Sequence, residues 1–375
     1  MKNLRKILFL VLSSCILFLC TACTGAITTK SKTYWAFGTY ATLVVSSDFS
    51  SQENVQKLND LDEQIFQTLQ TIENSLSLNV ASSYVNAFNS ANAGESVKVD
   101  EITATVLSIA KDMHSFTNGF FNPAFYYSLK AFGFYDGALA TTLPSQAELD
   151  GYKQIASAFN KIEIVQDESL AGDYYVSKPT DEVAFGGQTL NLKIDLGGIG
   201  KGYATDLVGS LLDDFGFVNG YFSVGNSSIS VKQSSGGENG EWTLSLAHPR
   251  EQGQAYAKIK IKNASLSTSG DYENFFERDG VRYCHIIDVN TCAPVSSDLL
   301  TVTVIGGTAT FADAVSTALL CMGSERATDF INKNLADYKI CMTVKNGESL
   351  KLLTNVNQAF ELVASDYSIA DFTGE

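Results

Sequence analysis

The chain has 375 residues, of which 45% are hydrophobic and 11% aromatic, a composition typical of a folded globular protein with one large or two smaller domains. Its formal net charge of -15 argues against a nucleic-acid backbone as a partner, because phosphate contacts along such a backbone need clustered Lys and Arg. A nucleotide ligand is not excluded, since a local site can oppose the overall charge.

The first 22 residues have the pattern of an export signal. Basic residues at positions 2, 5 and 6 precede an apolar run over 7–19, which is too short to predict a membrane-spanning helix. The sequence "CTAC" resembles the lipobox of bacterial lipoproteins, with Cys23 as the lipidated residue; ordinary secretion is the alternative. We therefore expect a lipid anchor at the extracytoplasmic face of the cell membrane, followed by a tether over residues 23–33.

The remaining chain alternates strand-like and helix-like segments. Apolar residues recur at helical spacing over 55–72, over 106–113 after Asp100 as a candidate N-cap, and over 204–215. Alternating segments predict strands at 39–47, 242–248, 257–263 and 299–305, and a last helix is expected from about Phe311. This order predicts a mixed α+β protein, with meandering strands after residue 218.

A glycine-rich segment, "IDLGGIGKGYATD" at 194–206, joins an apolar strand to the third helix. Such a turn can present backbone groups to a phosphate at a helix N-terminus. It matches neither the Walker A loop, because Asp195 stands where its first glycine should be, nor the dinucleotide motif GxGxxG. The alternative is a tight turn beside a solvated Lys201.

The last helix carries Asp313 and Thr317, which are four residues apart and so share one face. An acid beside a buried stripe needs a partner, and a carboxylate with a hydroxyl suits a hard cation such as Mg²⁺. The alternative is an acid favoured by the helix dipole and a threonine bonded back to a carbonyl.

The segment "YCHIIDVNTCAP" at 283–294 follows a hairpin turn predicted at Asp279-Gly280. Its His285 could take a proton from a hydroxyl, and Asp288 could orient that ring or bind a metal. A structural histidine is the alternative, and His114 and His248 are interpreted in that way. In "TNGFFNPAF" at 117–125, aromatic residues could stack on a flat ring or simply anchor the loop.

Each motif is weak alone, but their order strongly resembles the ApbE family. The order is "FGT" at 37–39, "GFFNPAF", "IDLGGIGKGYATD", "SGDYENFFERDGVRYCHIIDVNTCAP" and "ADAVSTA". Members of this family are flavin transferases that move FMN from FAD onto a protein threonine. The resemblance implies an α+β, ApbE-like (T-fold-like) domain over residues 34–365, with mixed helices and antiparallel sheets in two intimately packed lobes.

The resemblance also implies roles for individual residues. His285 would be the catalytic base, with Asp288 beside it, and Mg²⁺ would lie at the pyrophosphate of FAD. The metal ligands would be Asp313, Thr317 and the carbonyl of Gly198. The residues around FAD would be Phe37, Asn79, Phe120, Phe121, Asn122, Asp195, Lys201 and Ile286. The partners would be FAD and an exported flavoprotein acceptor with a target threonine, and AMP would be released.

Several positions depart from the family pattern. Val289 replaces a proline and Cys292 a glycine in the segment after His285, and "GN" replaces "GG" at Gly225. Of the four cysteines after residue 283, Cys284 and Cys292 could form a disulfide, or all four could be buried free thiols. Asn79 stands where many members place a tyrosine against the flavin, and a smaller side chain could admit water. An FAD pyrophosphatase therefore stays open as an alternative, as does a lipoprotein that binds flavin without catalysis.

Overall fold

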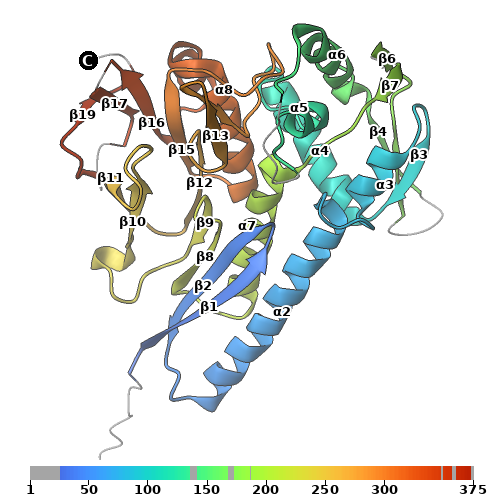
Figure 1. The fold of residues 1–375 in the computed structure, drawn as a ribbon. Helices are drawn as coiled ribbons and strands as arrows, with labels where there is room; N and C mark the ends of the chain where they lie inside the picture. Colours follow the sequence, from blue (N-terminus) through green and yellow to red (C-terminus); the bar gives the residue numbers. More distant parts are fainter. Residues whose placement is uncertain are drawn as a thin grey trace, which may run out of the picture.

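A nine-stranded sheet forms the centre of the protein (Figure 1). The computed structural model describes residues 26–135, 142–167, 173–185, 187–347, 349–356 and 360–372, so the signal segment and Cys23 lie outside the described residues. Neighbouring strands of the sheet are antiparallel except for the last pair, which is parallel. In spatial order the strands are β1 (Thr28–Ala36), β2 (Thr39–Ser47), β8 (Gly220–Val224), β9 (Ser228–Val231), β12 (Ala264–Gly270), β15 (Leu299–Ile305), β16 (Lys339–Asn346), β17 (Ser349–Thr354) and β19 (Tyr367–Ala370).

Both faces of this sheet are covered. Helices α7 (Gly197–Asp214) and α8 (Ala309–Asn334) pack on one face, and both bury the apolar stripes that their sequences predict. The other face contributes to a second core around Tyr256 with a small sheet of β10 (Trp242–Ala247), β11 (Ala255–Ile261) and β18 (Phe360–Leu362). The hairpin of β13 (Phe275–Arg278) and β14 (Val281–Cys284) turns at Asp279-Gly280, as expected.

A helical lobe packs beside the large sheet (Figure 1). Its helices are α2 (Gln52–Leu76), α3 (Tyr84–Ser90), α4 (Glu101–Phe116), α5 (Tyr126–Ala131) and α6 (Gln146–Ala156), with a 3-10 turn at Phe159–Lys161. Its short strands are β3 (Ser96–Val99), β4 (Glu163–Gln166), β5 (Tyr174–Ser177), β6 (Glu182–Phe185) and β7 (Gln188–Asn191); a second 3-10 turn, Glu238–Gly240, precedes β10. One hydrophobic cluster runs from Ile65 of α2 through Val208 of α7 to Leu319 of α8, so the two lobes share a core. The predicted α+β fold with packed lobes is confirmed.

Helices α7 and α8 meet at unusually close range. A Cβ on Gly202 would lie 2.4 Å from the carbonyl oxygen of Ala309, so only glycine fits there. The carboxylate of Asp206 accepts hydrogen bonds from the backbone N–H groups of Ala309 and Thr310, at 2.7 and 2.8 Å. An α7 carboxylate therefore supplies the missing partners at the N-terminus of α8.

Two expected boundaries are wrong. The tether does not extend to residue 33, because β1 begins at Thr28 and pairs with β2 along its whole length. The domain does not end at residue 365 either, since β19 continues the large sheet to Ala370. The four cysteines are buried free thiols, so the possible Cys284–Cys292 disulfide is not formed.

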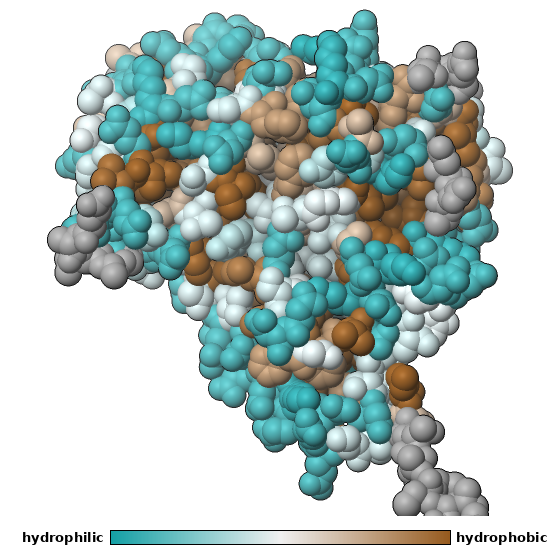
Figure 2. Space-filling view, turned by 180° about the vertical axis from the view of Figure 1, so that it is seen from behind, coloured by the Kyte–Doolittle hydropathy of each residue, from teal (hydrophilic) through white to brown (hydrophobic). Residues whose placement is uncertain are grey.

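The surface agrees with the acidic composition. The face seen from behind is mostly hydrophilic, and its apolar areas are separate patches (Figure 2). Among the described residues, every helix is too short or too polar to traverse a bilayer.

Candidate active site

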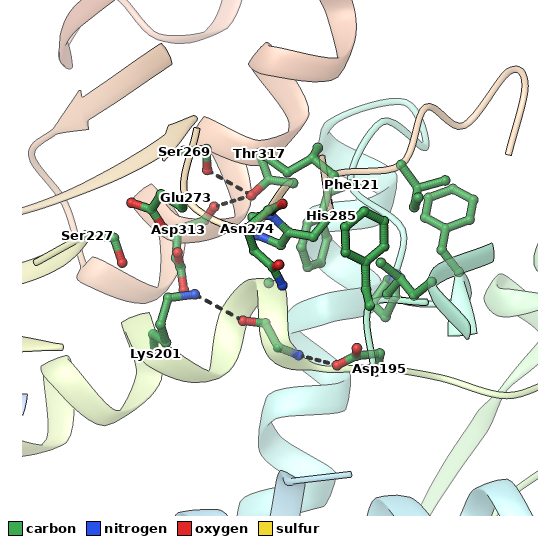
Figure 3. Close-up of a pocket in the computed structure, with 18 of the residues that line it drawn as sticks. Phe121, Asp195, Lys201, Ser227, Ser269, Glu273, Asn274, His285, Asp313 and Thr317 are labelled. Carbon is green, nitrogen blue, oxygen red and sulfur yellow. Dashed lines mark hydrogen bonds between the residues drawn. The ribbon is translucent and has the colours of Figure 1, made fainter. Parts of the chain in front are cut away.

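A cavity of about 340 Å³ opens where the two lobes meet. It brings together eleven of the thirteen residues that the sequence assigns to catalysis, FAD and metal, although they come from positions 37 to 317. These are Phe37, Phe120, Phe121, Asn122, Asp195, Gly198, Lys201, His285, Ile286, Asp313 and Thr317. Asp313 and Thr317 thus share one cavity with His285, as the family resemblance requires (Figure 3).

The acidic end of the cavity is built on α8. The side chain of Asp313 is 3% exposed; its Oδ1 accepts from the Ser267 hydroxyl at 3.0 Å and its Oδ2 from the Gly202 N–H at 3.0 Å. Thr317 donates to the Asp313 carbonyl at 3.1 Å and exchanges a hydrogen bond with the Ser269 hydroxyl at 3.0 Å. These contacts fix both oxygen groups in one orientation before any ligand binds.

This group of oxygens fits a hard divalent cation. Within the described chain, no Lys, Arg or His forms an ion pair with Asp313, and an unpaired buried carboxylate is costly. The Gly202 N–H that binds Asp313 is also the helical donor for the Gly198 carbonyl, so that carbonyl shares its partner and keeps lone-pair capacity. Carboxylate, hydroxyl and carbonyl oxygens are the ligands that Mg²⁺ prefers.

His285 is held as a neutral base. Its Nδ1 lies 3.3 Å from the carbonyl oxygen of Asn274, which can only accept, so Nδ1 carries the proton and Nε2 keeps its lone pair. Burial and the nearby Lys201 ammonium lower the pKa of the ring to about 4. The ring keeps some exposed area because it lines a recess, but protein atoms surround it. At neutral pH the imidazole can therefore accept a proton.

Asp288 does not join this site. It lines a separate surface pocket, and its Oδ1 accepts from the backbone and side-chain N–H groups of Asn290 at 2.8 and 3.0 Å. The carboxylate thus caps its own turn, and the Asn274 carbonyl is what contacts the His285 ring. The expectation that Asp288 orients His285 or binds the metal does not fit this geometry. In the same turn Cys292 has φ of 55°, which explains why the family pattern has glycine there.

The first turn of α7 forms the floor of the cavity. Asp195 accepts from the N–H of Gly197 at 2.7 Å and from the hydroxyl of Tyr135 at 2.8 Å. Lys201 reaches the Gly197 carbonyl at 3.3 Å, which places its ammonium group beside this turn (Figure 3). A helix N-terminus with a lysine attracts phosphate groups. The nearby asparagine in "GN", Asn226, has φ of 55°, a left-handed conformation that asparagine tolerates.

The aromatic walls are fixed from behind. His114 lies 2.9 Å from the carbonyl of Phe121, which supports its interpretation as a structural histidine. Phe37 occupies the tip of the β1–β2 hairpin with φ of 55°, and its N–H donates to Glu73 at 2.7 Å. Asn79 does not line the main cavity. It is exposed at a smaller cavity of about 180 Å³, which shares Phe37 and Asp195 with the main one.

Several lining residues carry no role in the sequence analysis. Glu273 is enclosed beside Lys201, and burial, together with the Asp313 carboxylate, raises its pKa. Glu273 and Asn274 both lie inside the motif "SGDYEN", so their position in the sequence was a usable signal. Tyr135, whose pKa is raised by burial and by Asp195, had no such signal because it belongs to no motif.

A second group of possible metal ligands, His248, Glu251 and Asp366, lies apart from the cavity. Nδ1 of His248 accepts backbone N–H groups from Arg250 and Glu251 at 3.2 and 3.0 Å, and Nε2 lies 3.2 Å from Asp366. The proton therefore sits on Nε2 and points at the carboxylate. A metal on Nε2 would need both nitrogens deprotonated, so this histidine is structural, as expected.

The sequence and the fold can be compared with known proteins. The model of the ApbE family matches residues 37–342. The chain belongs to the ApbE family. Over 305 residues it is 29% identical to the FAD:protein FMN transferase of Escherichia coli, covering 80% of this chain and 78% of that protein. Over 272 residues it is 30% identical to the FAD:protein FMN transferase of Treponema pallidum, covering 71% and 72%.

Solved structures of the family share the fold. The flavin transferase ApbE from Vibrio cholerae superposes with a TM-score of 0.72 at 23% identity, covering 88% of this chain and 98% of that one. The ApbE protein from Thermotoga maritima superposes with a TM-score of 0.69 at 26% identity, covering 86% and 96%.

Proposed function

We propose that this ApbE-family transferase moves FMN from FAD onto a threonine hydroxyl of an exported flavoprotein, with Mg²⁺ bound and AMP released. The observation that carries the proposal is a single cavity that holds a neutral histidine and an unpaired, buried aspartate. The names of the similar transferases and the family membership support the flavin chemistry.

The residues divide the work as follows. Nε2 of His285 accepts the threonine proton as the threonine oxygen bonds to the FMN phosphorus, and the bond from that phosphorus to the AMP phosphate oxygen breaks. Asp313, Thr317 and the Gly198 carbonyl would hold Mg²⁺, which neutralises charge on the pyrophosphate. Lys201 and the first turn of α7 hold the phosphates, and the phenylalanines of the 120–125 loop contact the flat rings.

A second candidate is hydrolysis of FAD to FMN and AMP. It is favoured by Asn79, a small exposed side chain at the edge of the cavity system. Water could replace the threonine hydroxyl there without any change in the base or the metal site.

One incubation separates these readings. The purified protein is mixed with FAD and Mg²⁺, with and without the unflavinylated form of an exported redox subunit, and AMP, free FMN and covalent flavin fluorescence are followed. We expect AMP in proportion to covalent flavin, and little AMP without the acceptor. AMP with free FMN in both samples would assign a pyrophosphatase, and tight FAD binding without any AMP would leave a flavin-binding protein.

We also propose that Cys23 is lipidated and anchors the protein to the extracytoplasmic face of the cell membrane. The support is the sequence "CTAC" after the export signal. Cys23→Ser should move the protein from the membrane fraction to the soluble fraction; retention in the membrane would exclude this anchor.

A further inference from the structure

The rim of the cavity carries two aromatic side chains that the fold leaves uncovered. Trp35 and Tyr40 are 64% and 65% exposed, the highest values among the large hydrophobic residues that the structure describes. They are direct cross-strand partners on β1 and β2, and their rings meet edge to face with centroids 5.0 Å apart. Isolated exposed hydrophobic residues are common, but a paired, oriented Trp and Tyr is the kind of anchor found at protein interfaces.

The pair is joined to the cavity at two points. The hairpin tip between the two strands is Phe37-Gly38, and Phe37 lines both the main and the smaller cavity. The carbonyl of Tyr40 accepts from the N–H of Gly225 at 2.9 Å, and Ser227, two residues further, lines the main cavity. The aromatic pair is therefore part of the rim, held by the hairpin on one side and by the 225–227 loop on the other.

The hairpin itself is braced from the core side. Tyr34 and Ala36 alternate with Trp35 and point inward, and the Phe37 N–H is fixed by Glu73 of α2. Because successive strand residues point to opposite faces, Trp35 and Tyr40 are directed away from this support. Their positions are rigid although their surfaces are exposed, which lowers the entropy cost of binding a partner.

We propose that Trp35 and Tyr40 form a docking surface for the acceptor protein. The inference rests on the proposed function: a hydroxyl on a folded protein has to enter this cavity, so the surrounding surface of that protein must cover the rim. A neutral aromatic pair supplies contact area on a chain whose overall charge is -15. The partner should present apolar groups near its target threonine, since Trp and Tyr anchors bind in apolar pockets.

The test uses Trp35→Thr/Tyr40→Thr, because threonine keeps the β propensity of both strands. Transfer is measured against the concentration of the acceptor subunit, and FAD affinity is measured by flavin fluorescence. We expect the KM for the acceptor to rise about 10-fold or more, the size of a lost interface anchor, while the FAD affinity stays within about 2-fold. Trp35→Phe/Tyr40→Phe should restore most of the acceptor affinity.

Phe66→Gln is the matched control. Phe66 is a 51% exposed aromatic residue on α2 that lines neither cavity, so its replacement should leave the KM for the acceptor unchanged. The docking proposal is overturned if the double threonine variant transfers with an unchanged KM. It is also overturned if FAD affinity falls in parallel, because the pair would then only brace the hairpin that carries Phe37.

Two other outcomes identify different roles. If wild-type protein transfers no FMN to any acceptor, the proposed function fails and the docking role fails with it; normal transfer by both proteins removes the docking role alone. A membrane role is tested with Cys23→Ser protein and vesicles of phosphatidylethanolamine and phosphatidylglycerol. We expect no binding, and binding that the threonine variant loses would assign the pair to the lipid surface instead.

Discussion

At the scale of single residues, the proton acceptor can be tested most directly. His285→Gln keeps a polar side chain of similar size but removes the basic nitrogen, so transfer should fall by about 10²–10⁴. FAD affinity should stay near the wild-type value, because the variant leaves the aromatic walls and the α7 turn unchanged. Stopped assays for AMP and flavin fluorescence titrations measure the two effects, and wild-type rates in the variant would remove His285 from its role.

The depressed pKa of His285 gives a second residue-level prediction. Its folded pKa of about 4 lies below the ordinary value of 6.5, so the ring stays neutral and competent well into the acid range. The acid limb of kcat/KM should therefore fall near pH 4 rather than near pH 6.5. An acid limb at pH 6 to 7 that disappears in His285→Gln would show that the ring titrates normally.

The oxygen group on α8 depends on a neighbour that touches no substrate. Ser267 donates to Asp313 and is itself hydrogen-bonded to Ser228 at 3.0 Å. Ser267→Ala should weaken Mg²⁺ binding about 10- to 100-fold in calorimetry, since groups that orient a ligand are worth this much. Ser265→Ala, on the same strand, is the control and should bind Mg²⁺ normally. Equal affinity in both variants would mean that Asp313 needs no help from Ser267.

Sequence reasoning succeeded where a residue's role follows from its own motif. Asp313, Thr317 and His285 were found in this way, and they share the cavity. It failed for Asp288, because a carboxylate before Asn290 can bind its own turn or a neighbouring ring, and only the backbone of residues 288–293 decides between them. The enclosure of Glu273 was equally hidden, since it depends on α7 and α8 folding over the same loop.

At the scale of elements, periodicity located the long helices but missed strands without an apolar pattern. Strand β1 is exposed over its first six residues and lies at the edge of the sheet, so "TTKSKT" looks like a tether. The short strands β3 to β7 were missed for the same reason. Helices α2, α4 and α7 bury broad stripes, and such stripes are visible in the sequence without knowledge of their partners.

The contact between α7 and α8 determines where the Asp313 helix begins. Asp206→Ala would leave two backbone N–H groups of α8 without their acceptor, and we expect a loss of about 2–4 kcal/mol in the free energy of unfolding. Mg²⁺ affinity should fall as well, because the same turn positions Asp313. Asp214→Ala, an exposed acid at the end of α7, is the control for denaturation and calorimetry. Equal stability of the two variants would contradict this account of the helix contact.

At the scale of the whole molecule, the shared core makes the two lobes one unfolding unit. The hydrophobic cluster contains Ile65 and Val106 of the helical lobe together with Val302 of the large sheet. The purified protein should therefore unfold in one thermal transition by calorimetry. Two separated transitions would show that the lobes fold independently.

Ligands that bridge the lobes should shift that single transition. The cavity takes Phe121 and Asn122 from one lobe and Ser269 and Thr317 from the other, so FAD contacts both. With Mg²⁺ present and FAD at about 100 times its Kd, linkage contributes about 2.7 kcal/mol, or roughly 3–8 °C in Tm. Asp313→Asn should keep the shift caused by FAD alone and lose the increment that Mg²⁺ adds. If Mg²⁺ raises the Tm of this variant as much as that of the wild type, the cation binds elsewhere, and the assignment of Asp313 and Thr317 is wrong.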